Sequence, residues 1–162
     1  MTDENNDNKN EKYFIFDLDE TLYKLDKNYT ITSQIDKQLL DKLSKIGKII
    51  LFSNASYSHC IYWIEVLDIK DYFSSIFSSD IIKYMKPNPL SYKKVVELAG
   101  IKPYDKVYFF DDISINLLSG MEEYKWNIYL INKKNDISNL NCKQFNTINN
   151  AISYILDTET SE

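Results

Sequence analysis

Two aspartates separated by a single residue end an apolar run near the start of the chain. The segment YFIFDLDETLY places Asp17 and Asp19 directly after the run, and Thr21 follows two positions later. At the end of a buried strand, two such close carboxylates cannot both ionise without a large electrostatic cost. The pair therefore needs a compensating cation, a chemical task that uses both acids, or both.

Three further polar groups follow apolar runs or lie in short loops. Ser53 and Asn54 follow IILF, Asp111 and Asp112 follow VYFF, and Lys86 lies in KPNP. Hard carboxylate oxygens with partial access to solvent favour Mg²⁺, which keeps several waters and also binds substrate phosphates. Lys86 and Ser53 can neutralise the oxygens of a transferring phosphoryl group, and Thr21 and the helix-starting backbone amides near Asn54 are further candidates for binding the phosphate. The set predicts a Mg²⁺-dependent phosphoryl-transfer site, with Mn²⁺ as an alternative metal.

The elements that must position these residues alternate between strands and helices. Continuous apolar runs predict strands at residues 13–16, 48–52, 75–78, 106–110 and 127–131. Helical periodicity predicts helices at residues 33–45, 57–67, 90–99, 113–121 and 147–156, with Thr32 or Ser33 as the first N-cap. This order predicts an α/β fold, a Rossmann-like parallel five-stranded sheet flanked by helices in three layers. The polar groups then share the rim formed by the carboxyl ends of the strands and the loops beside them.

On such a rim the two first aspartates can divide the chemistry between them. Asp17 is the candidate nucleophile, and Asp19 can protonate the leaving oxygen and then activate water. Each feature also has a plainer interpretation: a turn or helix cap for the aspartate pairs and for Ser53-Asn54, and a solvated loop residue for Lys86. If there were no such site, all of these separate interpretations would have to be true at once for residues on one rim. The phosphoryl-transfer site is therefore favoured.

Four segments of the chain resemble the four motifs of the haloacid dehalogenase superfamily of phosphatases. They are FDLDETLY, LFSN, KPNP and VYFFDDISIN, in the family's order and together covering roughly residues 13–131. The resemblance implies Asp17 as nucleophile and Asp19 as acid/base. It also implies Mg²⁺ on Asp17, on the backbone carbonyl of Asp19 and on the late acids, with Asp112 a direct ligand and Asp111 direct or through water. FDLDETLYK and FFDD are in addition similar to pyrimidine 5′-nucleotidase-like members.

The same resemblance implies a small flap at about residues 20–30 and a member without a cap domain. The intervals between Asp19, Ser53 and Lys86 are too short to hold a cap. Similar capless proteins act on phosphoproteins, on polynucleotide ends or on small sugar phosphates. An open site of this kind suits bulky phosphate esters, or a neighbouring subunit of a homo-oligomer that acts as a lid.

Composition limits the class of protein and its partners. The 162 residues carry a net charge of −5 and all 19 basic residues are lysines, so general attraction to nucleic acid or anionic membrane is not expected. We expect one domain at residues 12–156, a disordered tail at 1–11 and a flexible tail at 157–162. No secretion signal or membrane segment is recognisable, which predicts a soluble cytoplasmic protein in which Cys60 and Cys142 are free thiols.

The predicted function is therefore hydrolysis of a phosphomonoester through an aspartyl-phosphate, on a small metabolite such as a nucleotide or sugar phosphate. The alternatives are a phosphoprotein or polynucleotide-end phosphatase, and a non-catalytic module that binds phosphate and Mg²⁺ in signalling. A receiver domain is disfavoured because its acidic pair follows the first strand, whereas here the pair DD comes late. His59 is interpreted as a solvated or helix-side imidazole, and Tyr23 as a residue that packs the flap.

Overall fold

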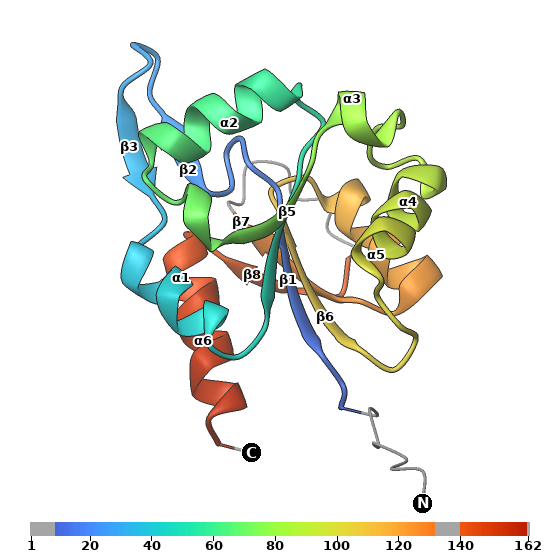
Figure 1. Ribbon diagram of the computed structural model, residues 1–162. Helices are drawn as coiled ribbons and strands as arrows, with labels where there is room; N and C mark the ends of the chain where they lie inside the picture. The colour runs from blue at the N-terminus through green and yellow to red at the C-terminus, as the bar shows by residue number, and fades with distance from the viewer. Residues whose placement is uncertain (1–8, 132–139, 162) are drawn as a thin grey trace, which may run out of the picture.

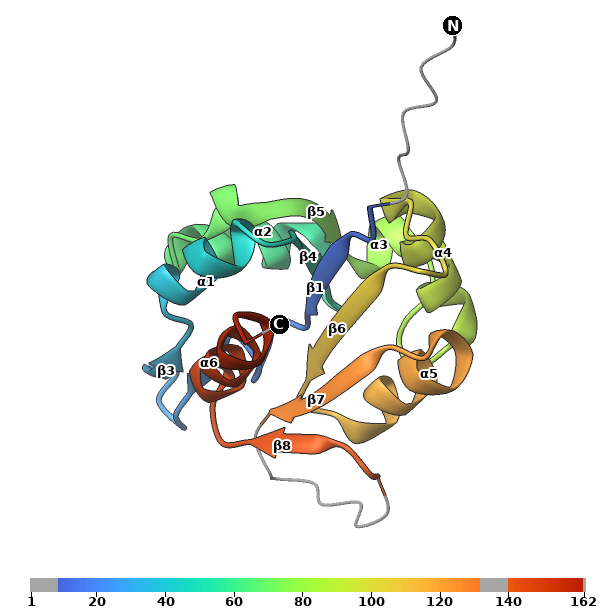
Figure 2. The same ribbon diagram turned by 90° about the horizontal axis from the view of Figure 1, so that it is seen from below.

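The computed structural model describes residues 9–131 and 140–161. Six strands form one parallel sheet in the order β5-β4-β1-β6-β7-β8 (Figure 2). They are β1 (Lys12–Phe16), β4 (Lys48–Phe52), β5 (Phe73–Phe77), β6 (Lys106–Asp111), β7 (Asn127–Ile131) and β8 (Lys143–Phe145). The predicted α/β class with a parallel sheet is confirmed.

Within residues 9–131 and 140–161, the remaining elements are one antiparallel hairpin, six α-helices and a short 3₁₀ turn (Figure 1). The hairpin pairs β2 (Tyr23–Leu25) with β3 (Ile31–Gln34). The helices are α1 (Lys37–Ser44), α2 (Tyr57–Val66), α3 (Ser79–Ile82), α4 (Pro89–Ala99), α5 (Ser114–Tyr124) and α6 (Ile148–Glu159), and the 3₁₀ turn spans Lys70–Tyr72.

Helices cover both faces of the sheet, as Figure 2 shows. One buried cluster joins alternate residues of β1, such as Phe14 and Phe16, to α1, α2 and α6. The second cluster joins the intervening residues Tyr13 and Ile15 to α4 and α5. Alternate strand residues point to opposite faces. The continuous apolar runs are therefore needed because the central strands are covered on both sides.

The number of strands in the sheet and the start of the first helix differ from the sequence prediction. The sheet has six strands rather than five, because the short and largely polar β8 pairs with β7. The first helix begins at Lys37 rather than residue 33, because Ser33 pairs with Lys24 in the hairpin and Asp36 caps the helix through Gln38 N. Thr32 and Ser33 are therefore not the N-cap.

The last helix continues to Glu159 and so includes residues 157–159, which the sequence assigned to a flexible tail. The side chain of Glu159 is only 5% exposed and forms ion pairs with Lys12 and Lys106, at the starts of β1 and β6. These contacts fix the end of α6 against the sheet. Most of the predicted N-terminal tail, residues 1–8, lies outside the described residues.

The two intervals that the sequence predicts to be too short for a cap domain lie within residues 9–131, which the structure describes continuously. The segment between β1 and β4 holds the hairpin and α1, and the segment between β4 and Lys86 holds α2, the 3₁₀ turn, β5 and α3. Among the described residues, no helix has the length and apolar character needed to cross a membrane.

Candidate functional site

The register of the three central strands brings the acidic residues together. Phe16, the last residue of β1, pairs with Leu51 of β4 on one side and with Phe110 of β6 on the other. Asp17 therefore emerges beside the ends of both neighbours, and its backbone N–H donates to the Phe110 carbonyl at 2.9 Å. Because parallel strands end on one edge, the residues after β1, β4 and β6 share a single rim.

Lys86 lies at the centre of this rim. Its ammonium donates to Asp17 Oδ1 at 3.0 Å, to Asp111 Oδ2 at 2.8 Å and to the Phe52 carbonyl at 2.8 Å. The side chain is 1% exposed. Burial opposes its charge, but the Asp111 and Asp17 carboxylates outweigh burial and raise the pKa of Lys86. The lysine is therefore a fixed positive charge between two of the predicted site acids.

Asn54 holds the segment that carries this lysine. Its side-chain oxygen accepts the Lys86 backbone N–H at 2.8 Å, and its amide nitrogen donates to the Lys86 carbonyl at 3.0 Å. The side chain of a residue after β4 thus positions the loop before α4. Both polar atoms of the Asn54 side chain take part in this contact, and the residue's predicted role in binding phosphate stays a prediction.

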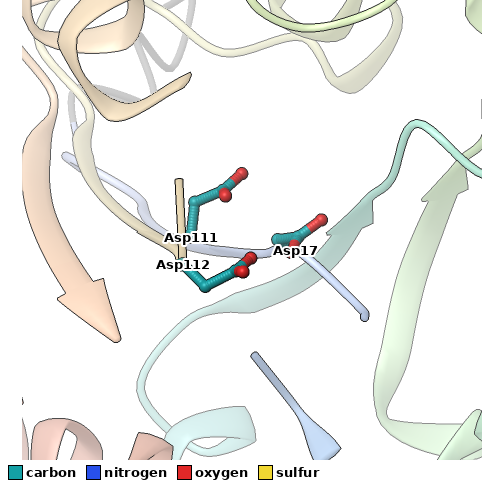
Figure 3. Close-up of side chains that lie close together, drawn as sticks. All are labelled: Asp17, Asp111 and Asp112. Atoms are coloured by element: carbon teal, nitrogen blue, oxygen red, sulfur yellow. The ribbon is translucent and has the colours of Figure 1, made fainter. Parts of the chain in front are cut away.

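Three carboxylates form the acidic cluster of the site, defined here as Asp17, Asp111 and Asp112. One oxygen of each lies within 4.8 Å of the others. Figure 3 shows the three side chains projecting into the same space from two neighbouring strand ends. Asp111 accepts from the Ile113 N–H at 2.9 Å and from the Asn116 amide at 3.2 Å, as well as from the lysine.

The crowding of the acidic cluster changes its ionisation. Burial, followed by the charges of Asp17 and Asp111, raises the pKa of Asp112 to about 8. Burial and the charge of Asp17 also raise the pKa of Asp111 to about 6, although Lys86 opposes the shift. The pKa values rise in part because the three carboxylates carry more negative charge than the single ammonium of Lys86 neutralises.

A divalent cation fits this donor set. Carboxylate oxygens are the hard ligands that Mg²⁺ prefers, and the excess negative charge is what a cation would neutralise. Asp112 is not fully buried, so the cluster is reachable from solvent. The three acids could therefore hold a metal ion.

Thr21 and Ser53 lie on the same rim and are both buried. The Thr21 hydroxyl donates to Asp17 Oδ2 at 3.0 Å and lies 3.4 Å from Asp112 Oδ1. Ser53 follows β4, and its hydroxyl accepts the Ala55 N–H at 3.1 Å. The structure thus brings Thr21 into direct contact with the acidic cluster and places Ser53 at the neighbouring strand end.

Asp19 lies in the turn after β1 and faces a different set of partners. Its Oδ1 accepts the Tyr23 hydroxyl and lies 2.8 Å from His59 Nε2. Burial and the Asp19 carboxylate raise the pKa of Tyr23, so the phenol keeps its proton and acts as the donor. Sequence reasoning gave His59 no part in the site and missed this contact. The available signal was its place in the first turns of α2, the helix that starts at the rim.

The chain is similar to known proteins in both sequence and structure. A family model described as haloacid dehalogenase-like hydrolase matches residues 28–120, more than half of the chain. The matched region includes Ser53, Lys86 and the late acidic pair, whereas Asp17 and Asp19 precede it.

Several solved structures share the fold at low sequence identity. A HAD-superfamily hydrolase of subfamily IA from Geobacter sulfurreducens is 16% identical with a TM-score of 0.65, covering 89% of this chain and 99% of that one. A HAD family enzyme from Bacteroides thetaiotaomicron, an Asp-to-Ala variant in complex with magnesium and inorganic phosphate, is 20% identical with a TM-score of 0.62, covering 79% and 97%.

An L-2-haloacid dehalogenase from Xanthobacter autotrophicus, with chloropropionic acid covalently bound, is 14% identical with a TM-score of 0.62. The alignment covers 74% of this chain and 59% of the dehalogenase. At such identities the likeness shows the fold, and the chemistry must be argued from the site itself.

Proposed function

Because this chain belongs to the haloacid dehalogenase-like hydrolases, we propose that it hydrolyses phosphomonoesters with Mg²⁺ and forms an aspartyl-phosphate on Asp17. The observation that carries the proposal is the convergence of Asp17, Lys86 and the late acidic pair on one rim, with Asp19 two residues further on. A nucleophilic carboxylate, a fixed ammonium and a cation-binding cluster are the parts that phosphoryl transfer requires.

The reaction proceeds in two steps, formation of the aspartyl-phosphate and its hydrolysis. First, a carboxylate oxygen of Asp17 attacks phosphorus, the bond from phosphorus to the ester oxygen breaks, and that oxygen takes a proton from Asp19. Next, a water oxygen attacks the phosphorus, and Asp19 takes the proton of that water. The bond to Asp17 breaks, its electron pair returns to the carboxylate, and inorganic phosphate leaves.

The other rim residues supply charge and orientation. Lys86 neutralises phosphoryl oxygens as well as Asp17, and its buried position keeps it in place before substrate arrives. The Ser53 hydroxyl and the backbone amides near Asn54 contribute donors to the phosphate. The Thr21 hydroxyl orients Asp17 through its hydrogen bond.

Mg²⁺ would be held by Asp17, by the backbone carbonyl of Asp19 and by the late acids. Asp112 is the better direct ligand there, because both oxygens of Asp111 already accept hydrogen bonds from Ile113, Lys86 and Asn116. When bound, the ion would offset the negative charge that the nucleophile and the phosphate bring together. Mn²⁺, which also takes oxygen ligands, is a reasonable substitute.

Turnover of p-nitrophenyl phosphate tests the proposal. We expect hydrolysis that requires Mg²⁺ and stops with EDTA. Asp17→Asn should lose at least about 10³-fold in kcat, because the nearly isosteric amide cannot attack phosphorus. Asp41→Asn, which makes the same change at a helical aspartate whose side chain is 48% exposed, is the matched control. Activity of the Asp17 variant near that of the wild type would refute the assignment.

A substrate panel addresses the natural ester. We expect a nucleotide or sugar phosphate to react best, and compare these with phosphopeptides and 3′-phosphorylated oligonucleotides. The net charge of −5 and the absence of arginine favour the small molecules over nucleic-acid ends. Turnover of phosphopeptides alone would instead assign a phosphoprotein phosphatase with the same chemistry. Mg²⁺ binding without turnover of any ester would indicate the non-catalytic module.

A further inference from the structure

The carboxylate of Asp19 is held through one of its two oxygens. Both the Tyr23 hydroxyl and His59 Nε2 meet Oδ1. Among the described residues, the hydrogen bonds made by this carboxylate all reach that same atom. The arrangement fixes the carboxylate by Oδ1 and leaves Oδ2 as the oxygen available for proton transfer.

The two residues that hold Asp19 come from different elements and support one another. Tyr23 begins β2 of the hairpin, and its ring stacks on Trp63 of α2 with centroids 4.1 Å apart. His59 lies one turn before Trp63 on the same helix, and the two rings meet edge to face at 6.5 Å. Asp19 is therefore oriented by a packed group of aromatic rings.

We propose that His59 and Tyr23 are positioning residues that hold Asp19 in the orientation needed to protonate the leaving oxygen. This inference rests on the proposed phosphatase function and adds to it His59, which lies outside the four motif segments, and Tyr23, the last residue of FDLDETLY. In the first step the proton passes from Asp19 Oδ2 to the ester oxygen as its bond to phosphorus breaks. His59 and Tyr23 keep their hydrogen bonds to Oδ1 and exchange no proton with the substrate.

The leaving group decides how much a well-placed acid matters. An alcohol leaves as a strongly basic alkoxide unless it is protonated, whereas p-nitrophenolate is stable enough to leave without a proton. General acid catalysis is worth about 10²–10⁴-fold where the proton is needed. Loss of Asp19 orientation must therefore slow an alkyl ester far more than a nitrophenyl ester.

The experiment compares benzyl phosphate with p-nitrophenyl phosphate, two esters of similar size. His59→Phe and Tyr23→Phe keep an aromatic ring in place and remove the hydrogen bond to Asp19. We expect each variant to lower kcat/KM for benzyl phosphate by roughly 10- to 100-fold. The kcat/KM for p-nitrophenyl phosphate, which reports the same first chemical step, should change by less than about threefold.

Two further variants distinguish loss of the hydrogen bonds to Asp19 from a general disturbance of the packing around it. His59→Gln restores a donor nitrogen near the place of Nε2, and should return kcat/KM for benzyl phosphate to within about threefold of the wild type. Tyr62→Phe, one helix position from Trp63 and 59% exposed, removes a hydroxyl that does not reach Asp19 and should leave both esters unaffected.

Three results would overturn the inference. They are an equal loss with both esters, no loss with either ester, and the same selective loss in Tyr62→Phe. Wild-type protein that hydrolyses neither ester would instead refute the proposed function itself, and the inference would fall with it. Thermal unfolding of each variant, expected to match the wild type within a few degrees, verifies that the comparison is made on folded protein.

Discussion

Lys86 is a buried charge whose cost is offset by partners far away in the sequence. Its ammonium meets one carboxylate 69 residues earlier and another 25 residues later. An unpaired lysine in such a place would lose its proton, because burial disfavours the charged form. Here the paired acids keep it charged, so the positive potential at Asp17, the proposed nucleophile, exists before substrate binds.

Replacing this charge should damage both catalysis and folding. We expect Lys86→Met to lower kcat by about 10²–10³-fold, because a fixed donor to the transition state is lost. Unfolding by urea should show a loss of about 3–5 kcal/mol, because Asp17 and Asp111 are left buried without a counter-charge.

The control is Lys93→Met, which makes the same change on the exposed face of α4 and should leave both measurements near wild type. If the Lys86 variant kept its activity, the lysine would have a structural role only.

At the scale of elements, the site depends on how neighbouring segments are tied together. Two hydrogen bonds between the Asn54 side chain and the Lys86 backbone hold the loop before α4 against the segment that follows β4. The hairpin packs against α2 through the stacking of Tyr23 on Trp63. The first contact joins a loop to the end of a core strand, and the second joins the hairpin to a helix that packs on the core.

Removing the contact between Asn54 and Lys86 should lower both activity and stability. Asn54→Ala removes two partly buried hydrogen bonds and should cost about 1–3 kcal/mol of unfolding free energy. We expect kcat for p-nitrophenyl phosphate to fall by roughly 10- to 100-fold, because displacement of Lys86 by even 1 Å weakens its contact with the phosphoryl group.

Asn127→Ala provides a matched comparison. It removes an amide that donates to the Val107 carbonyl at 3.0 Å, at the opposite end of the sheet. This variant should lose some stability but keep full turnover. Equal effects of the two substitutions on kcat would argue against a positioning role for Asn54.

At the scale of the whole molecule, the acidic cluster should make stability depend on pH and on metal. Asp111 and Asp112 have pKa values of about 6 and about 8 in the folded protein, above the value near 4 expected in the unfolded chain. Folding therefore favours their protonated forms. Their contribution is fully present below pH 4 and is lost as the pH rises through 6 and 8.

Mg²⁺ should reverse this loss. Without metal, the contribution of Asp111 and Asp112 should lower the melting temperature measured by calorimetry as the pH rises from 5.5 to 8.5. At pH 8 and 100 times its Kd, Mg²⁺ should add about 2.7 kcal/mol, or roughly 5–10 °C in melting temperature. At pH 5 protons compete for the ligands and the shift should be smaller. Asp112→Asn should abolish the Mg²⁺ shift, and its persistence would move the metal elsewhere.

The sequence by itself determined the order of the elements and the residues of the rim. Apolar runs followed by polar residues predicted β1, β4 and β6 within one residue of their ends, because a strand covered on both faces must be apolar. The polar residues follow where the chain leaves the strand for the rim. The parallel arrangement then requires Asp17, Ser53 and the late acidic pair to share an edge. The family match is consistent with this order.

Only the tertiary structure decided which side chains hold one another. The contact of His59 with Asp19, 40 residues apart, depends on where α2 lies against the hairpin. The two bonds from Asn54 to the Lys86 backbone depend on the path of a loop. The sixth strand, β8, is short and largely polar, and its sequence alone does not predict a strand. It forms because it pairs with the edge of β7. Such contacts arise from packing between elements, and local periodicity carries no record of them.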